Sequence, residues 1–428
     1  MQRKDGYVAD VPYPPHFYKE MQPLWLATLA QFLNSPAPDL TKPYAYCELG
    51  CGMGINLLVA AATNPHGYFV GVDFNVQHLT IARTAAECIG LTNIHFVQAD
   101  FSSFLQDNKF YFDFIACHGT WSWIAQQHQQ AIQQIVNKSL KPAGIFYLHY
   151  MSHPGATHLI PLQKLLNDFA HQASGTSVQK IQHAMMLLQK LVDAGAFIDQ
   201  PAMVQHVQAL AKKDAHYLAH EFLTDYWQPQ HSSDLHQQLA ITGLEYIGSA
   251  NAIENMEELS VPGNIQPLLT GLPPSLQETL RDIGRNQHQR MDLFQRKTAT
   301  TNENNSMLFD AISFQLLPTA PLAGNLLFKT PIGEIPGPAE IFSPLLQALV
   351  LQPKTIAQLK QLPVFFHQPE LLLQALQMLM WAEYTHPVRT NLNAANDEHI
   401  KKLRDWIRKN GLTIEIIERC ATAVKTKP

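Results

Sequence analysis

The stretch Glu48-Leu49-Gly50-Cys51-Gly52-Met53-Gly54 decides the fold. It stands between a short apolar run, residues 44–49, which predicts a buried strand, and a helical pattern over residues 55–63. Its alternate glycines let the backbone turn sharply and approach a ligand closely. The N-terminus of the following helix offers unpaired N–H groups to an anionic group. The pattern therefore predicts a ligand-binding turn after the first strand of an α/β fold.

The spacing of the glycines separates this turn from two other nucleotide-binding loops. A nicotinamide site normally has G-x-G-x-x-G, whereas here the glycines follow G-x-G-x-G and the sixth position is Ile55. A phosphate-binding P-loop is excluded as well, because no Gly-Lys-Ser/Thr follows. The turn therefore indicates a different class of ligand.

Apolar runs alternate with helical patterns between residues 44 and 150. The predicted strands are 44–49, 68–73, 94–99, 111–117 and 145–150, and the predicted helices are 55–63, 76–89 and 124–140. Strands and helices at this spacing form right-handed βαβ units. We therefore expect a Rossmann-like, mostly parallel, doubly wound sheet that is covered by helices on both faces.

The character of the chain changes beyond this region. We expect a ligand-binding core over residues 1–170 and a helical region over 171–300, with strands near 245 and 292 that could complete the core sheet. The polar stretch 298–306 reads as a linker. Residues 301–428 predict an α+β module that resembles a winged helix. A cut within 302–305 should then leave a folded core.

Acidic residues end the first three predicted strands. Glu48 lies just before the glycine turn, Asp73 ends the second strand and Asp100 follows the third. The carboxyl ends of strands in an open α/β sheet form its ligand-binding edge. A carboxylate such as Asp73 can accept bonds from two vicinal ribose hydroxyls, and Asp100 could accept one from an adenine amino group. The set predicts a nucleoside-containing ligand.

This arrangement resembles the class I S-adenosylmethionine-dependent methyltransferases, with their E/D-x-G-x-G-x-G pattern and acidic residues after the second and third strands. The resemblance implies S-adenosylmethionine as cofactor, with its methionine part on the Gly50–Gly54 turn, its ribose on Asp73 and its adenine on Asp100 and Phe101. The cofactor-binding residues that it implies are Glu48, Gly50, Cys51, Gly52, Gly54, Asn56, Asp73, Phe74, Ala99, Asp100, Phe101 and His118.

A narrower resemblance covers most of the chain. Its motifs are Tyr13-Pro14-Pro15, Cys117-His118-Gly119-Thr120-Trp121-Ser122-Trp123, Tyr217-Leu218-Ala219-His220-Glu221-Phe222-Leu223 and Gly243-Leu244-Glu245-Tyr246. They resemble methyltransferases with a methyltransferase regulatory domain, which include the rickettsial-type protein-lysine methyltransferases that act on outer-membrane proteins. The chain departs from the family after His118-Gly119 and in the loop over residues 150–156, which lacks the family's Asn and Trp. These departures concern the methyl acceptor more than the cofactor.

Three residues are candidates for the acceptor side of the site. A neutral His118 after the fourth strand could accept a proton or orient a nucleophile. Trp121, together with Trp123, could wall the pocket and stack on a cationic substrate, and Tyr13 could close it as part of an N-terminal lid. Core packing is the alternative for the tryptophans, and an extended arm is the alternative for the Tyr13 segment.

The function that we expect is in-line methyl transfer to lysine side chains of a protein substrate. A small-molecule or natural-product methyltransferase and a non-catalytic, cofactor-binding regulator are the alternatives. Since a sulfonium reaction needs position and a free lone pair, a dedicated base is optional. His220-Glu221 does not indicate a metal site, because position 224 is Thr where a metal-binding helix would have His. No metal is expected.

Composition limits the partners. The chain has 428 residues, is 46% hydrophobic and 15% charged, and carries a net charge of −5, which excludes a disordered chain and argues against nucleic acid. No Asp/Asn-Pro-Pro-Tyr run of the amino-directed nucleic-acid methylases follows the fourth strand. Without an apolar run of membrane-spanning length or a signal peptide, and with five cysteines, we expect a cytoplasmic protein with no stable membrane insertion. The helical and C-terminal regions could also pair two chains into a homodimer.

Overall fold

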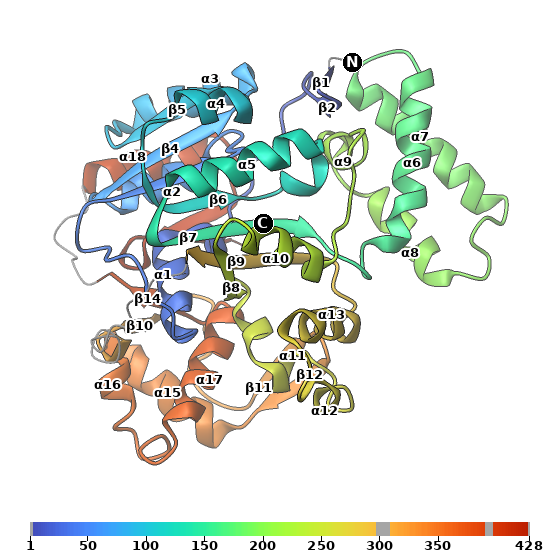
Figure 1. The fold of residues 1–428 in the computed structure, drawn as a ribbon. Coiled ribbons are helices and arrows are strands. Elements are labelled where there is room, and N and C mark those ends of the chain that lie inside the picture. Colours follow the sequence, from blue (N-terminus) through green and yellow to red (C-terminus); the bar gives the residue numbers. More distant parts are fainter. Residues whose placement is uncertain (1–2, 297–308, 390–396, 427–428) are drawn as a thin grey trace.

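A seven-stranded sheet lies at the centre of the computed structural model, which describes residues 3–296, 309–389 and 397–426 (Figure 1). The strands run in the order β5-β4-β3-β6-β7-β9-β8. They are β3 (Tyr44–Leu49), β4 (Gly67–Asp73), β5 (Ile94–Gln98), β6 (Phe112–Cys117), β7 (Leu140–Met151), β8 (Leu244–Ser249) and β9 (Gln289–Arg296). Neighbouring strands are parallel from β5 to β7, and β9 is antiparallel to both β7 and β8. The expected mostly parallel sheet is confirmed.

Helices cover both faces of this sheet, as expected for a doubly wound fold. One face packs against α1 (Pro23–Phe32), α2 (Ile55–Thr63) and α3 (Val76–Ile89), and the other against α4 (Phe101–Asp107), α5 (Gln126–Ser139) and α10 (Ser232–Ala240). Side chains of β3 alternate between the two faces, with Tyr46 in the first core and Cys47 in the second. Parallel strands buried on both sides explain the continuous apolar runs of the sequence.

The structure corrects three local expectations. Residues 101–107 form the helix α4, which was not expected from the sequence. This helix begins here because Asp100 caps its N-terminus by accepting a hydrogen bond from the Ser103 N–H. The helix expected from residue 124 begins at Gln126, after a 3₁₀ turn over Trp121–Trp123. β7 begins at Leu140, so the expected strand over 145–150 starts five residues earlier.

A lobe of helices lies beside the sheet, to the right in Figure 1, and is drawn mostly in green. It consists of α6 (Ile160–Gln172), α7 (Ser177–Asp193), α8 (Pro201–Leu210) and α9 (Ala215–Phe222). Its core includes Val8 and Val11 of the N-terminal arm, which carries the short strands β1 (Arg3–Lys4) and β2 (Tyr7–Val8). The arm therefore joins the lobe to the sheet.

Between the lobe and the C-terminal region, short helices follow β8: η4 (Ala252–Asn255), α11 (Glu257–Ser260), α12 (Gln266–Leu269) and α13 (Pro274–Arg285). Together with α10, helix α13 packs beside β8 and β9 at the edge of the sheet. Among the described residues, no helix combines the length and the apolar character needed to span a membrane.

The C-terminal region contains a three-stranded sheet in the order β13-β10-β14. Its elements are β10 (Ser313–Leu316), β11 (Leu326–Thr330), β12 (Gly333–Gly337), α15 (Ala339–Leu351), β13 (Lys354–Thr355), α16 (Ile356–Leu359), α17 (Pro369–Trp381), β14 (Thr385–Val388), α18 (Asp397–Lys409), β15 (Ile414–Ile417) and β16 (Thr422–Lys425). The α+β character is as expected, whereas the winged-helix detail and the domain boundaries stay predictions. The expected linker over 298–306 lies outside the described residues.

The C-terminal region shares its hydrophobic core with the sheet. Buried side chains of α15 and α17 belong to the same continuous cluster as those of β3, α1 and α2. Helix α18 packs directly on α2 and α3, away from α15, α16 and α17 in Figure 1. The Lys19 ammonium and the Glu383 carboxylate, 2.8 Å apart, form an ion pair between the two regions. The region is thus not a separately packed appendage.

Candidate functional site

The glycine turn adopts the backbone that its sequence demands. Gly50, Gly52 and Gly54 all have positive φ, at 77°, 52° and 70°. A Cβ added at Gly50 would meet Thr120 and one at Gly54 would meet the ring of Phe96, so both glycines are needed for close packing. A Cβ added at Gly52 would meet nothing within 4 Å. Gly52 therefore faces open space.

Asp73, at the end of β4, holds this turn in place. Its Oδ2 accepts a hydrogen bond from the Gly52 N–H at 2.8 Å, and its Oδ1 accepts one from the Asn75 N–H at 2.7 Å. The side chain is 8% exposed and borders the same space as Gly52. Since an ionised carboxylate accepts about four hydrogen bonds, roughly two acceptor positions are left for a ligand.

Glu48 is buried beside the turn, with 4% of its surface exposed. Burial raises its pKa to about 8, and the nearby Asp73 adds to the rise while a hydrogen bond from Asn56 opposes it. Its Oε2 has no hydrogen-bond partner among the described residues. An unpartnered buried acceptor is costly, so this oxygen fits a donor group on a ligand.

A cavity of ≈ 290 Å³ opens at the carboxyl edge of the sheet. Every residue of the expected cofactor-binding set lines it: Glu48, Gly50, Cys51, Gly52, Gly54, Asn56, Asp73, Phe74, Ala99, Asp100, Phe101 and His118. Most of them lie at or just after the ends of β3, β4, β5 and β6, which parallel pairing brings to one edge, while Asn56 and Phe101 lie at the starts of α2 and α4. We call this part of the cavity, from Glu48 to Phe101, the cofactor half.

The remaining wall, which we call the acceptor half, is aromatic. His118 lies after β6, where the tilted ring of Tyr18 contacts it with centroids 3.8 Å apart and His149 of β7 stacks on it at 4.1 Å. Its Nδ1 lies 2.7 Å from the hydroxyl of Tyr147. Burial and the neighbouring His149 lower the pKa of His118 well below its ordinary value, so the imidazole is neutral at neutral pH.

The two tryptophans of the motif over residues 117–123 have different positions. Trp121 does not line the cavity: it is fully buried in the core between the sheet and α5. Trp123 is the tryptophan that lines the cavity, where its ring lies parallel to that of His149 with centroids 6.0 Å apart. The structure therefore places Trp121 among core residues, the alternative that the sequence left open.

Tyr13 lies on the N-terminal arm, which covers the cavity. Its backbone N–H donates to Nε2 of His78 on α3 at 3.1 Å, and its ring lies 5.3 Å from that of His220 on α9. Tyr13 thus lines the cavity, while its role as a lid residue and in turnover stays a prediction.

Several lining residues were not among the sequence candidates. They are Tyr7, Tyr18, His149, Tyr217, His220 and Glu221. Tyr217, His220 and Glu221 stand in a motif that was noticed, but its sequence distance from the sheet concealed its position. Tyr7 and Tyr18 flank Tyr13 on an arm that has little regular structure. Within the described residues, no three His, Cys, Asp or Glu side chains come together to hold a metal ion.

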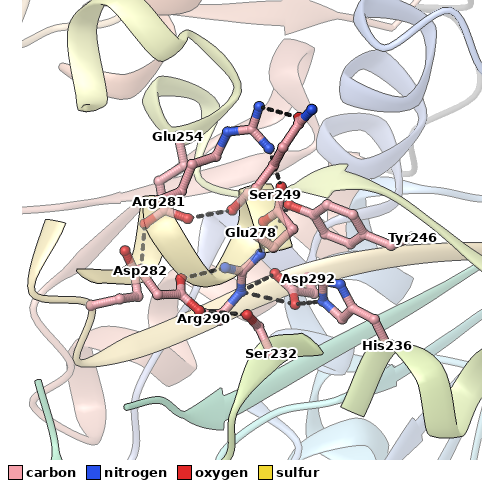
Figure 2. Close-up of polar contacts among 12 residues, drawn as sticks. Ser232, His236, Tyr246, Ser249, Glu254, Glu278, Arg281, Asp282, Arg290 and Asp292 are labelled. Atoms are coloured by element: carbon pink, nitrogen blue, oxygen red, sulfur yellow. Dashed lines mark hydrogen bonds and ion pairs between the residues drawn. The ribbon is translucent and has the colours of Figure 1, made fainter. Parts of the chain in front are cut away.

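A buried ion network fixes the strand that forms the floor of the acceptor half (Figure 2). Gln289 and Met291 of β9 line the cavity, and the alternate residues Arg290 and Asp292 point away from it. The Arg290 guanidinium binds Asp292 at 3.0 Å, Asp282 of α13 at 2.5 Å and a third carboxylate, Glu278, at 2.7 Å. Figure 2 shows this arginine at the centre of the carboxylates.

Comparison with known proteins identifies the family. Residues 40–190 match the model of a methyltransferase domain, and residues 214–296 match the model of a predicted methyltransferase regulatory domain. The chain is 30% identical over 393 residues to the uncharacterized protein sll1526 of Synechocystis, which covers 90% of this chain and 77% of that protein. It belongs to the methyltransferases with a regulatory domain.

Two rickettsial proteins resemble this methyltransferase. The uncharacterized protein RP789 of Rickettsia prowazekii is 28% identical over 288 residues, which are 65% of this chain and 49% of that protein. The structure of PKMT2 from Rickettsia typhi in complex with AdoHcy superposes with a TM-score of 0.67 at 20% identity, over 89% of this chain and 78% of that one. The superposition shows a common fold.

S-adenosylmethionine is the cofactor of this methyltransferase, and it supplies a methyl group activated on a sulfonium. The residues of the cofactor half fit it: Gly52 leaves open space, Asp73 retains acceptor positions, and the unpartnered oxygen of Glu48 suits an ammonium group. Asp100 lines the cavity and also caps α4 through one oxygen. The assignment of single residues to the methionine, ribose and adenine parts stays a prediction.

Proposed function

We propose that this methyltransferase methylates lysine side chains of a protein substrate. The observation that carries the proposal is the aromatic wall of the acceptor half, made by Tyr13, Tyr18, Trp123 and Tyr217. Aromatic faces attract an ammonium group and favour a long aliphatic side chain. The resemblance of the sequence motifs to the rickettsial-type lysine methyltransferases supports the same acceptor.

The chemistry of an amine acceptor suits this wall. A lysine amine has an ordinary pKa near 10.4, so almost all of it is protonated at neutral pH and lacks a free lone pair. Removal from water into an aromatic pocket lowers that pKa, and so does the positive charge of the sulfonium.

A protein substrate suits the extra regions of the chain. A stable protein contact covers about 800 Å² on each partner, far more than the rim of a small cavity. Helix α9 belongs to the core of the helical lobe and also lines the cavity through Tyr217 and Glu221. A protein that docks on the lobe would thus approach the acceptor half directly.

Methyl incorporation tests the proposal. The full chain, with methyl-labelled S-adenosylmethionine, is incubated with the protein fraction and with the small-molecule fraction of a cell extract. We expect label in protein, and mass spectrometry should place it on lysine side chains. A Gly52→Val variant, in which a side chain enters the cofactor half, is the negative control. Label confined to the small-molecule fraction would indicate a small-molecule methyltransferase, and cofactor binding without label in either fraction would indicate a regulator.

A further inference from the structure

One carboxylate that borders the cavity, Glu221, comes from the helical lobe and not from the sheet. Glu221 lies on α9, whereas Glu48 lies on β3 beside the glycine turn. Trp227 donates a hydrogen bond from its Nε1 to the Glu221 Oε1 at 3.4 Å. Burial raises the pKa of Glu221 to about 7. The carboxylate is thus partly buried and held by Trp227 where it lines the acceptor half.

Aromatic side chains line the same cavity as this carboxylate. Four tyrosines line the same cavity as Glu221: Tyr7, Tyr13, Tyr18 and Tyr217. The negative charge of Glu221 contributes to the raised pKa of each of them. Burial contributes the larger part of each rise. Trp123 lines the same part of the cavity. Within the described residues, no lysine or arginine pairs with Glu221, so the chain itself supplies no cation to it.

The neighbouring His220 keeps the helix that carries Glu221 in position. Its Nε2 donates to the carbonyl of Val11 at 2.9 Å, and its Nδ1 accepts from the Tyr7 hydroxyl at 3.2 Å. Burial lowers the pKa of His220 to about 4, so it stays neutral and does not compensate the charge of Glu221. The arm and α9 therefore form one rigid frame around an uncompensated carboxylate.

Glu221 is partly buried, and a carboxylate that is largely removed from water without a counter-charge is costly unless a ligand supplies one. Aromatic rings that enclose a carboxylate make a site for an alkylammonium group, because the rings attract the cation and the carboxylate accepts its N–H bonds. We propose that Glu221 receives the ammonium group of the methyl acceptor within this ring of aromatic side chains. The identity of the amine as a lysine rests on the function proposed above. Glu48 and Glu221 then serve two different cations, one in each half of the cavity.

Calorimetry with two matched probes tests this site. The full chain is saturated with AdoHcy and titrated with Nα-acetyl-lysine N-methylamide, or with its norleucine counterpart, which lacks the ammonium group. We expect wild type to bind the lysine probe roughly 10- to 100-fold more tightly, the effect of a hydrogen bond to a charged group. Glu221→Gln should lose this preference and keep its affinity for AdoHcy. Glu87→Gln, which removes an exposed carboxylate on α3, should behave as wild type.

The pH dependence of wild type gives a second measurement that needs no variant. As pH rises through about 7, Glu221 ionises and the preference for the lysine probe should grow, because the probe stays protonated in this range. The four tyrosines, with raised pKa values, and His220, with its pKa near 4, stay neutral there. The norleucine probe reports any general effect of pH.

Three results would overturn the site. These are a wild type without preference for the lysine probe, a preference that does not change with pH, and a Glu221→Gln variant that loses AdoHcy instead. Failure of the proposed function looks different. If the preference for the lysine probe depends on Glu221 but only the small-molecule fraction of an extract is labelled, the amine site is supported and the proposed protein substrate is wrong. If Glu221→Gln methylates protein lysines as fast as wild type, the function stands and the site falls.

Discussion

Gly52 is the position at which one added side chain tests the cofactor half. Its φ of 52° costs an L-residue about 1–2 kcal/mol, and no protein atom lies within 4 Å of a Cβ built there. Gly52→Val should therefore fold and lose S-adenosylmethionine binding in calorimetry. Gly243→Ala, which has a φ of 78° and equally open space but lies away from the cavity, should bear a similar strain and bind normally. Unchanged affinity in a folded Gly52→Val variant would show that the turn does not hold the cofactor.

The buried Glu48 should make stability depend on pH. Its folded pKa of about 8 lies above its ordinary value of 4.5, so its contribution to stability is complete below the lower value and is lost as pH rises toward the higher one. Glu48→Gln has no carboxyl group at this position to ionise, so the variant does not lose this stability. From about pH 5 to about pH 8, the unfolding free energy of the variant relative to that of wild type should therefore increase by a few kcal/mol. Urea unfolding without cofactor at both pH values measures it. A constant difference, as expected for the exposed control Glu87→Gln, would mean that Glu48 is ionised throughout.

Two tryptophan variants can distinguish residues that act in the acceptor half from residues that only pack in the core. Trp123→Ala and His118→Ala should keep cofactor affinity within a few-fold and lose turnover, because these residues line the acceptor half. Trp121→Ala should instead lose about 3–5 kcal/mol of stability, the usual cost of emptying a buried aromatic position. Thermal unfolding and methyl-transfer rates for the three variants distinguish the roles. A Trp121→Ala variant with wild-type stability and no turnover would reverse the assignment.

At the scale of elements, Arg290 ties together the edge of the sheet and the helices beside it. It joins β9 to α13 through Glu278 and Asp282, while Asp292 accepts hydrogen bonds from Tyr150 of β7 and His236 of α10. Arg290→Leu leaves these carboxylates buried without their cation, which should cost about 3–5 kcal/mol in urea unfolding. Arg408→Leu, which breaks an exposed pair with Asp405 on α18, should cost at most about 1 kcal/mol. Equal costs would show that the network in Figure 2 adds no stability.

At the scale of the whole molecule, the shared hydrophobic core predicts that removal of the C-terminal region destabilises the rest of the chain. α18 covers α2 and α3, and Arg389 donates to the carbonyl of Thr63 at the end of α2. A chain with a protease site inserted within 302–305 should, after cleavage, still elute as one species and melt in one transition.

Residues 1–296 expressed alone should aggregate, because apolar surface that α15, α17 and α18 cover would meet water. This reverses the sequence-based expectation of an independently folded core. A monomeric 1–296 fragment that binds S-adenosylmethionine as the full chain does would restore that expectation. Light scattering and calorimetry provide the two measurements.

Local signals explain what could be predicted. The strands 44–49 and 94–98 and the glycine turn were recognisable because continuous apolar runs, helix caps and glycine spacing act within a few residues. The cofactor half follows from them, since parallel strands necessarily bring Glu48, Asp73 and Asp100 to one edge. α4 was missed because its cap, Asp100, was read as a ligand contact, and one side chain can do both.

The sequence by itself determined the class of fold and the cofactor half, because both depend on short-range patterns repeated along one sheet. Tertiary structure alone decided the acceptor half. Tyr13 and Glu221 are separated by about two hundred residues, and they meet because the arm packs into the core of the helical lobe. It also decided that Trp123 and not Trp121 lines the cavity, since a 3₁₀ turn rotates neighbouring side chains to different faces. Such contacts have no local signature, because burial between distant segments is set by the whole chain at once.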